Sequence, residues 1–237
     1  MKITIIGFGR LGKSIHTILR DKDIAHTVIK RDQEIPPSDL YYLTVPDASI
    51  VSVSKKVPKT GVLLHAAGSL APEILRPHPC VGVLHPIMTF PGPDVALPPP
   101  PIPASISGDR RAVEVGLMFG KQLGFETFPF EGDRSLYHAA AVISGNFASL
   151  FLEIAGAIMA QKSTLSQQEA KKILSPLALR SLQNSTDLPL EKSLTGPASR
   201  KDLQTIQRHQ EAILSFSPEL ADLYGACTEI MFQYLKR

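Results

Sequence analysis

The sequence predicts an α/β protein in which a parallel-sheet domain is followed by an all-α helical domain. In the first half, short β-rich runs alternate with amphipathic or polar segments, a rhythm typical of parallel strands joined by crossovers. From Asp133 onward the pattern changes to long helical stretches rich in Ala, Leu, Gln and Lys. We therefore expect two domains, residues 1–132 and residues 133–237.

Seven β-rich runs are the candidate strands of the first domain. They cover residues 2–6, 26–29, 40–45, 61–65, 80–84, 102–106 and 125–130. The prolines at 98–101 can form neither a helix nor a central strand, so they predict an extended surface connector.

Four helices are expected in the second domain, over residues 134–160, 166–183, 200–214 and 218–236. Ser166 precedes Glu169 by three residues, which is the spacing of a capping box. The first helix is apolar nearly all round, so it must be covered on all sides. Its internal polar residues disfavour a membrane span. We expect a second copy of the chain to supply part of the cover, as a homodimer formed through the helical domain.

Charge and cysteine content narrow the functional classes. The formal net charge of +3 comes without a basic run, which disfavours nucleic acid or a membrane surface as a partner and leaves a small anionic molecule. The two cysteines, Cys80 and Cys227, are too few for a disulfide framework or a cysteine-based metal site. They are typical of a reducing compartment, so we expect a cytoplasmic protein without a metal.

A glycine motif follows the first strand and opens a helical segment. It comprises Gly7, Phe8, Gly9, Arg10, Leu11 and Gly12. In a strand-turn-helix context this spacing predicts a Rossmann-type dinucleotide site. The first glycine permits the turn, the second admits the pyrophosphate, and the third lets the helix close onto the strand.

The end of the second strand selects the nucleotide. This fold contacts the adenosine ribose at the end of the second strand, with a carboxylate in NAD sites and an arginine in NADP sites. The residues at this position are Lys30, Arg31 and Asp32. Both residue types are present. Arg31, directly after the strand, favours NADP(H), and Asp32 is interpreted as a solvated turn residue.

Ligands of an open α/β sheet bind at the carboxyl ends of its strands. Thr44, Val45 and Pro46 follow the third strand, and we expect them to contact the nicotinamide half of the cofactor. His65 and His85 end the fourth and fifth strands. Each is a candidate for contact with cofactor or substrate, and the alternative is a histidine satisfied by backbone groups at the rim of the cleft.

A resemblance to a known family is carried by GFGRLG, TVPD after the third strand, HP after the fifth, YHAAAVISGN and LTGPASRKDLQTIQRH. The chain resembles predicted oxidoreductases that join a Rossmann-like NADP domain to a C-terminal helical domain of unassigned function. It is similar more distantly to ketopantoate reductase, pyrroline-5-carboxylate reductase and the 6-phosphogluconate and β-hydroxyacid dehydrogenases. The resemblance covers essentially the whole chain and implies an NADP-dependent oxidoreductase.

In those distant relatives, a helix entering the second domain carries a catalytic lysine with an asparagine on the same face. This chain has no lysine between Lys121 and Lys162, so that role does not carry over. His138 is the replacement candidate, with Asn146 to orient the reacting group and Ser144 beside it. The alternatives are a histidine buried against the sheet and a buried asparagine bonded to a neighbouring helix.

Polar residues of the third expected helix complete the candidate site. Thr205 and His209 share one helical face, and Arg200 could clamp a substrate carboxylate. The alternative is an exposed helix with ordinary side-chain pairs, and only the resemblance favours a functional role.

These residues predict an NADPH-dependent reductase of a small 2-oxo acid, most concretely 2-dehydropantoate. One alternative is a related oxidoreductase acting on an imine or a cyclic acid, of the pyrroline-carboxylate or prephenate type. Another is an NADP(H)-binding sensor or scaffold without turnover.

Overall fold

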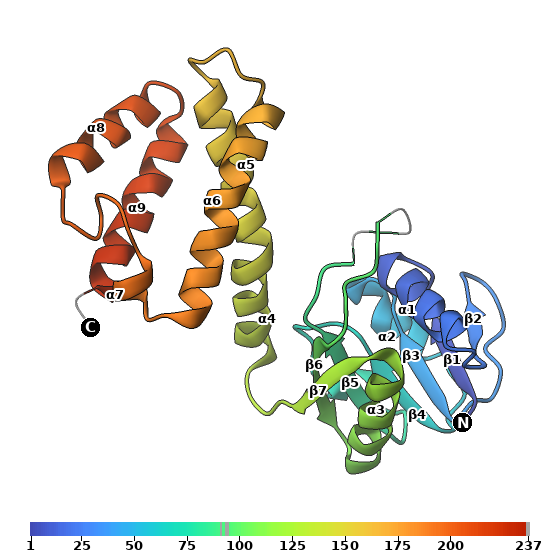
Figure 1. Ribbon diagram of the computed structural model, residues 1–237. Coiled ribbons are helices and arrows are strands. Elements are labelled where there is room, and N and C mark those ends of the chain that lie inside the picture. The colour runs from blue at the N-terminus through green and yellow to red at the C-terminus, as the bar shows by residue number, and fades with distance from the viewer. Residues whose placement is uncertain (91, 93–94, 236–237) are drawn as a thin grey trace. The chain divides into compact units, whose positions relative to one another are not determined.

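The computed structural model describes residues 1–90, 92 and 95–235. It consists of two compact units, Met1–Gly145 and Asn146–Arg237 (Figure 1). The division falls inside a long helix that begins at Arg134, whereas the change in sequence pattern placed a boundary at the start of that helix.

The first unit is built on a seven-stranded sheet with the spatial order β2-β1-β3-β4-β5-β6-β7. The strands are β1 (Ile3–Ile6), β2 (Thr27–Ile29), β3 (Leu40–Leu43), β4 (Val62–His65), β5 (Val81–Pro86), β6 (Ile102–Gly108) and β7 (Phe125–Pro129). Every residue of β1, β3 and β4 is buried, as expected for parallel strands covered on both faces. Each strand overlaps a predicted run, and the predicted α/β class is confirmed.

One strand pair departs from the predicted parallel sheet, because β5 and β6 run antiparallel. Residues 87–101 connect them, and the described part of this connection contains no helix. Without a crossover the chain re-enters the sheet from the edge at which β5 ended, so β6 must run back. The proline segment 98–101 lies outside helices and strands at the surface, as predicted.

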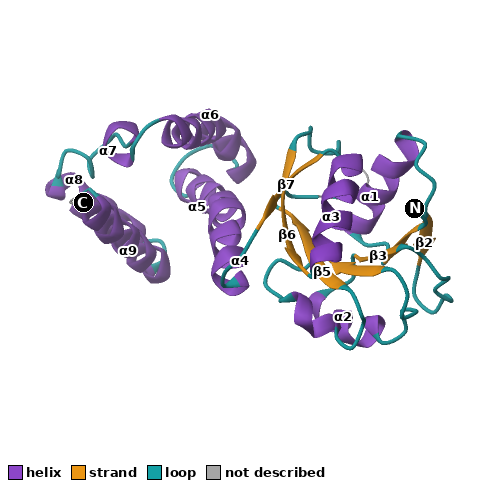
Figure 2. Ribbon diagram, turned by 90° about the horizontal axis from the view of Figure 1, so that it is seen from below, coloured by secondary structure: helices purple, strands orange, loops and turns teal. Residues whose placement is uncertain are grey.

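Helices cover both faces of this sheet (Figure 2). Helices α1 (Arg10–Asp21) and α3 (Arg110–Leu123) pack on one face around a core that includes Ile15 and Phe119. On the other face, α2 (Asp47–Ser54) and a 3₁₀ turn (Pro72–Leu75) enclose a second core.

The order of the strands locates the ligand crevice of the fold. From β1 the chain first moves outward to β2 and then returns to β3 on the opposite side of β1. The direction of winding thus reverses between β1 and β3, and open α/β sheets bind ligands outside the carboxyl ends of the strands at such a point.

The helical part begins with α4 (Arg134–Val142), a π-helical turn (Ile143–Phe147) and α5 (Ala148–Ala160). The other helices are α6 (Gln167–Asp187), α7 (Leu190–Ser193), α8 (Leu203–Leu214) and α9 (Pro218–Tyr234). Within the second unit, α5 packs along α6 and α8 packs along α9 (Figure 1). The predicted capping box is confirmed at the start of α6.

The helix from Arg134 to Ala160 is long and apolar enough to cross a membrane by length and composition alone, and only 6% of its most apolar window is buried. One such helix is weak evidence for a span. We expected this helix to be covered on all sides, but Leu136 is 72% exposed and Ile143 is 60% exposed in the single chain.

Candidate functional site

The glycine loop lies between β1 and α1, and each glycine has a distinct surrounding. Gly7 adopts a φ of 108°, in the left-handed region that favours glycine. A Cβ on Gly12 would overlap the Gly7 carbonyl oxygen and stand 2.7 Å from the Thr44 hydroxyl oxygen. A Cβ on Gly9 would meet nothing within 4 Å. The loop is therefore tightly packed at both ends and open in the middle.

The open space over Gly9 adjoins the start of α1. Gly9 is the N-cap of this helix and supplies no side-chain cap, so the first backbone N–H groups are not capped by a side chain. An anion at this point would be favoured by those groups and by the helix dipole. The predicted division of roles among the three glycines therefore fits a bound pyrophosphate.

Thr44 joins the third strand to this loop. Its hydroxyl donates to the carbonyl oxygen of Gly7 at 3.0 Å. Arg10 is exposed as the first residue of α1, and Leu11 packs against the core. Thr44 and Leu11 thus hold the loop against the core of the domain, and Arg10 is exposed to solvent.

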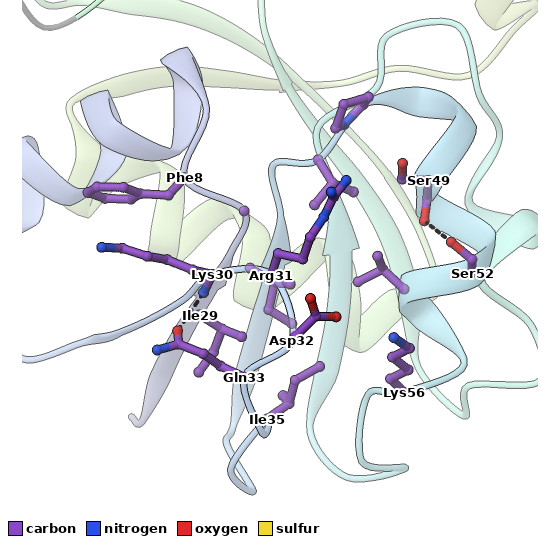
Figure 3. A pocket seen from close by; sticks show the side chains of 15 residues that line it. Phe8, Ile29, Lys30, Arg31, Asp32, Gln33, Ile35, Ser49, Ser52 and Lys56 are labelled. Atoms are coloured by element: carbon purple, nitrogen blue, oxygen red, sulfur yellow. Dashed lines mark hydrogen bonds between the residues drawn. The ribbon is translucent and has the colours of Figure 1, made fainter.

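A pocket of about 370 Å³ opens beside the loop on the side of β2 (Figure 3). Its walls come from the loop, the turn after β2, the segment after β3, and α2. Its lining residues are Ile6, Gly7, Phe8, Ile29, Lys30, Arg31, Asp32, Gln33, Ile35, Val45, Pro46, Ser49, Ser52, Val53 and Lys56. The structure thus brings five predicted residues together here: Gly7, Phe8, Arg31, Val45 and Pro46.

The two cations after β2 point in different directions. Lys30 extends beside Phe8, with its ammonium 5.1 Å from the centre of the ring. Arg31 stands between the turn and α2 (Figure 3), and within the described chain its guanidinium has no ion pair or hydrogen bond to protein. Arg31 is thus the better placed of the two to meet an anion in the pocket.

Sequence reasoning missed the α2 wall of this pocket. Ser49, Ser52 and Lys56 face Arg31 across it. Their spacing of three and four residues is that of one helical face, but the same spacing occurs on any exposed helix. Only the fold shows that this face is opposite the turn after β2.

A second polar cluster lies at the carboxyl end of β5, on the other side of the crevice. His85 Nδ1 and the Tyr137 hydroxyl are 2.7 Å apart. The rings of His85 and His138 meet edge to face, with centroids 5.8 Å apart. A Cβ on Gly68 would overlap His138 and stand 2.8 Å from His85 Nε2. The loop after β4 therefore packs closely against both histidines.

Arg134 holds the first turn of α4 onto the sheet. Its guanidinium donates to the Gly68 carbonyl at 3.1 Å, to the Ser107 hydroxyl at 3.1 Å and to the Ser105 hydroxyl at 3.4 Å. The same group lies 5.2 Å from the centre of the Tyr137 ring. This buried arginine fixes the position of Tyr137, and its role could not be read from the sequence.

Burial controls the protonation of the cluster. The pKa of His85 is lowered to about 4, chiefly by burial and further by the charges of His138, Arg134 and His65. Burial raises the pKa of Tyr137, and a hydrogen bond with Ser105 and the charge of Arg134 partly offset this. At neutral pH the pair is therefore a neutral imidazole and a protonated phenol.

His65 is fully buried and faces its own loop. Its Nδ1 accepts a hydrogen bond from the Ala67 N–H, so its Nε2 carries the proton and donates to the Ala71 carbonyl at 3.4 Å. Burial lowers its pKa to about 4. His65 thus shapes the loop that carries Gly68 and offers no surface to a cofactor.

The remaining predicted residues belong to the helical part. Ser144 and Asn146 lie in the π-helical turn, a feature often found at functional sites. Thr205 accepts a hydrogen bond from Arg208 at 2.8 Å, and His209 Nδ1 lies 2.9 Å from the Tyr224 hydroxyl. Arg200 precedes α8. Asn146 and the α8 residues are in the second unit.

Comparison with known proteins gives full-length structural matches of low sequence identity. A protein of Bacteroides fragilis proposed to be an NADP oxidoreductase matches with a TM-score of 0.81 at 19% identity, covering 98% of both chains. Pyrroline carboxylate reductase of Plasmodium falciparum, solved with NADP bound, matches with a TM-score of 0.61 at 12% identity, covering 99% of this chain and 98% of that one. An imine reductase of Streptomyces aurantiacus gives 0.66 at 13%, with the same coverage.

These likenesses show the fold, a Rossmann-type domain with C-terminal helices. No curated protein matches the sequence. A family model described as a domain of unknown function, DUF2520, matches residues 102–230, which is more than half of the chain. The chain therefore belongs to the DUF2520 family.

Proposed function

We propose that this protein is an NADPH-dependent reductase of a small carboxylate-bearing compound with a C=O or C=N bond. The observation that carries the proposal is the open space over Gly9 beside a pocket that holds the guanidinium of Arg31. A pyrophosphate at the start of α1 would place an adenosine in that pocket and direct the nicotinamide toward β3 and β4.

Arg31 supports the choice of NADPH over NADH. A guanidinium can bind a 2′-phosphate through two parallel hydrogen bonds, and here it is not engaged by a described protein carboxylate. Lys56, in the turn after α2, adds a second positive charge on the same side of the pocket. The solved structure with NADP bound supports the same choice.

When bound, the reduced nicotinamide supplies a hydride to the carbon of the C=O or C=N bond. The protein must then supply a proton to the oxygen or nitrogen and stabilise the charge that develops there. In this proposal His85, Tyr137 and His138 form the proton-donating cluster, at the strand ends on the nicotinamide side of the crevice.

The helical part is proposed to recognise the substrate. Asn146 would orient the reacting group, with Ser144 beside it, and Arg200 would bind the carboxylate with Thr205 and His209 nearby. The position of Asn146 in a π-helical turn supports this role.

Two substrate classes follow from this design. A 2-oxo acid, for which 2-dehydropantoate is our specific candidate, matches the available cations. A cyclic imine acid matches them equally well, and the pyrroline carboxylate and imine reductases of similar fold favour it. Prephenate is a further cyclic acid for the same panel.

We also propose a cytoplasmic homodimer formed through the helical unit. Helix α6 alone exposes Ile173, Leu177, Leu179 and Leu182, each by more than half. Burial of one such side chain contributes about 1.5–3 kcal/mol, so a second copy is a strong candidate for the cover. Sedimentation at micromolar concentration should show a dimer, and a monomer would remove this part of the proposal.

The first experiment is to mix purified protein with NADPH and each candidate acid and to follow NADPH absorbance, with NADH as the control. Consumption of NADPH with one acid supports the reductase and identifies the substrate. Tight binding of NADPH without consumption by any acid favours a nucleotide sensor. Failure of both nucleotides to bind contradicts the proposal.

A further inference from the structure

We infer that the phenol of Tyr137 is the proton donor of this site and that His85 and Ser105 position it. The inference rests on the proposed reductase function and assigns one role within it. It is drawn from the hydrogen bonds, packing and accessibility of the cluster at the carboxyl end of β5.

The Tyr137 hydroxyl is held from two sides. His85 Nδ1 lies 2.7 Å from it, and Ser105 on β6 is near enough to lower its pKa. The ring packs against Phe130 at a centroid distance of 4.6 Å, with the guanidinium of Arg134 at 5.2 Å from its centre. A phenol oxygen can accept two hydrogen bonds and donate one. In the His85 tautomer that carries its proton on Nδ1, the phenol oxygen accepts from His85 and its own proton is directed elsewhere.

His85 and Tyr137 are both half-buried, and the two ring nitrogens of His85 lie against protein groups. Its Nδ1 faces Tyr137, and its Nε2 faces the backbone of Gly68 so closely that a Cβ there would stand 2.8 Å away. Both ring nitrogens are thus directed at protein groups. Tyr137 is half-buried as well, and we assign its hydroxyl as the group of the pair that meets the substrate.

The charges around the pair suit proton donation by a phenol. Arg134 from α4 lies under the ring, His138 faces His85, and His65 adds its effect from β4. Because burial keeps His85 neutral at neutral pH, it is a poor acid there, whereas the phenol is fully protonated. The nearby guanidinium of Arg134 stabilises the phenolate that remains after transfer.

A bound reduced nicotinamide would supply the hydride to the substrate carbon as the π bond to oxygen or nitrogen breaks. The proton of the Tyr137 hydroxyl passes to that oxygen or nitrogen. The resulting phenolate regains a proton from water, which its partial exposure allows.

The test is Tyr137→Phe, which removes only the hydroxyl and keeps the ring over Arg134. With the substrate identified by the panel, kcat should fall about 100-fold or more. The KM should remain within about twofold of wild type, and so should the NADPH dissociation constant measured by fluorescence titration. Neither quantity depends on the proton transfer of the chemical step. The matched control is Tyr234→Phe, at an exposed tyrosine far along the chain, which should leave kcat unchanged.

A second substrate separates proton donation from positioning. An N-alkylated cyclic iminium ion already carries the positive charge and needs no proton at nitrogen. If wild-type protein reduces it, Tyr137→Phe should reduce it at a rate within about threefold of wild type. An equal loss on both substrates would assign Tyr137 to positioning and overturn the inference.

The failures are distinguishable. Absence of NADPH consumption by wild-type protein defeats the proposed reductase itself. Wild-type turnover that survives Tyr137→Phe within a few-fold defeats only the role of Tyr137. A larger loss of kcat with His138→Gln than with Tyr137→Phe would move the proton donor to His138. Urea unfolding of each variant checks that the fold is retained.

Discussion

Two glycines of the loop give opposite predictions for the same substitution. In Gly12→Ala the new methyl group overlaps the Gly7 carbonyl oxygen and comes within 2.7 Å of the Thr44 hydroxyl oxygen. Overpacking of this kind costs about 1–3 kcal/mol. At roughly 2–4 °C per kcal/mol for a chain of this size, Tm should fall by about 2–12 °C.

In Gly9→Ala the methyl group meets no protein atom within 4 Å, and the φ of −73° suits alanine. The free energy of unfolding should therefore change by less than about 1 kcal/mol, because alanine restricts the unfolded chain but is a poorer N-cap residue than glycine. The same methyl group enters the space proposed for the pyrophosphate. NADPH affinity should fall at least about tenfold, which corresponds to about 1.4 kcal/mol.

Thermal unfolding followed by circular dichroism and NADPH titration followed by fluorescence measure both effects on the same three proteins. The expected result is a crossed pattern, in which Gly9→Ala loses binding at full stability and Gly12→Ala loses stability. Tight NADPH binding by Gly9→Ala would refute the proposal that the pyrophosphate occupies the space over Gly9. A Gly12→Ala variant as stable as wild type would refute the packing argument.

Three further predictions concern Arg31, the buried histidines and Arg134. Arg31→Ala should weaken NADPH binding about 10-fold to 100-fold and leave NADH binding within about twofold in parallel titrations, because only NADPH carries the 2′-phosphate. Equal losses of affinity for the two nucleotides would contradict the proposal that Arg31 binds this phosphate. Burial lowers the pKa of His65 and of His85 from the ordinary 6.5 to about 4 in the folded chain, so the unfolded chain binds more protons between these values. Urea unfolding should show stability falling as pH drops from 6.5 toward 4, by up to about 3 kcal/mol per histidine, with a shallower slope in His65→Gln; a slope unchanged by that variant would contradict the assignment. Arg134→Lys retains the charge but cannot reach all three acceptors, so the free energy of unfolding should fall by about 1–3 kcal/mol. The control Arg110→Lys, at an exposed site, should lower it by only a few tenths of a kcal/mol. Similar losses for the two variants would show that the three hydrogen bonds contribute little.

The glycine loop shows how far local pattern can lead. The spacing of Gly7, Gly9 and Gly12 after an apolar run predicted a turn, an open approach and a close packing contact, and the structure has these three features in that order. Such a motif is informative because all its members lie within one turn of chain. The place of Arg31 beside the pocket was likewise predictable, since Arg31 lies two residues after the end of β2.

His65 illustrates the limit of the strand-end rule. Position at the carboxyl end of β4 made it a candidate for cofactor contact, but its side chain turns into its own loop and bonds to Ala67 and Ala71. The rule states where a residue stands along the strand and says nothing of which way the following loop folds. Three residues later in the same segment, Gly68 packs against His85 and His138.

The sequence by itself determined the succession of strands and helices along the chain, the glycine loop at the N-terminus of α1 and the capping of α6. Each of these depends on residues near one another in the chain. The tertiary structure alone decided the direction of β6, the α2 wall of the pocket and the cluster of His85 with Tyr137. That cluster joins residues 52 positions apart and is held by a buried arginine bonded to two separate segments, the loop after β4 and strand β6. Contacts of this kind arise when elements pack across the sheet, so no local spacing in the sequence records them.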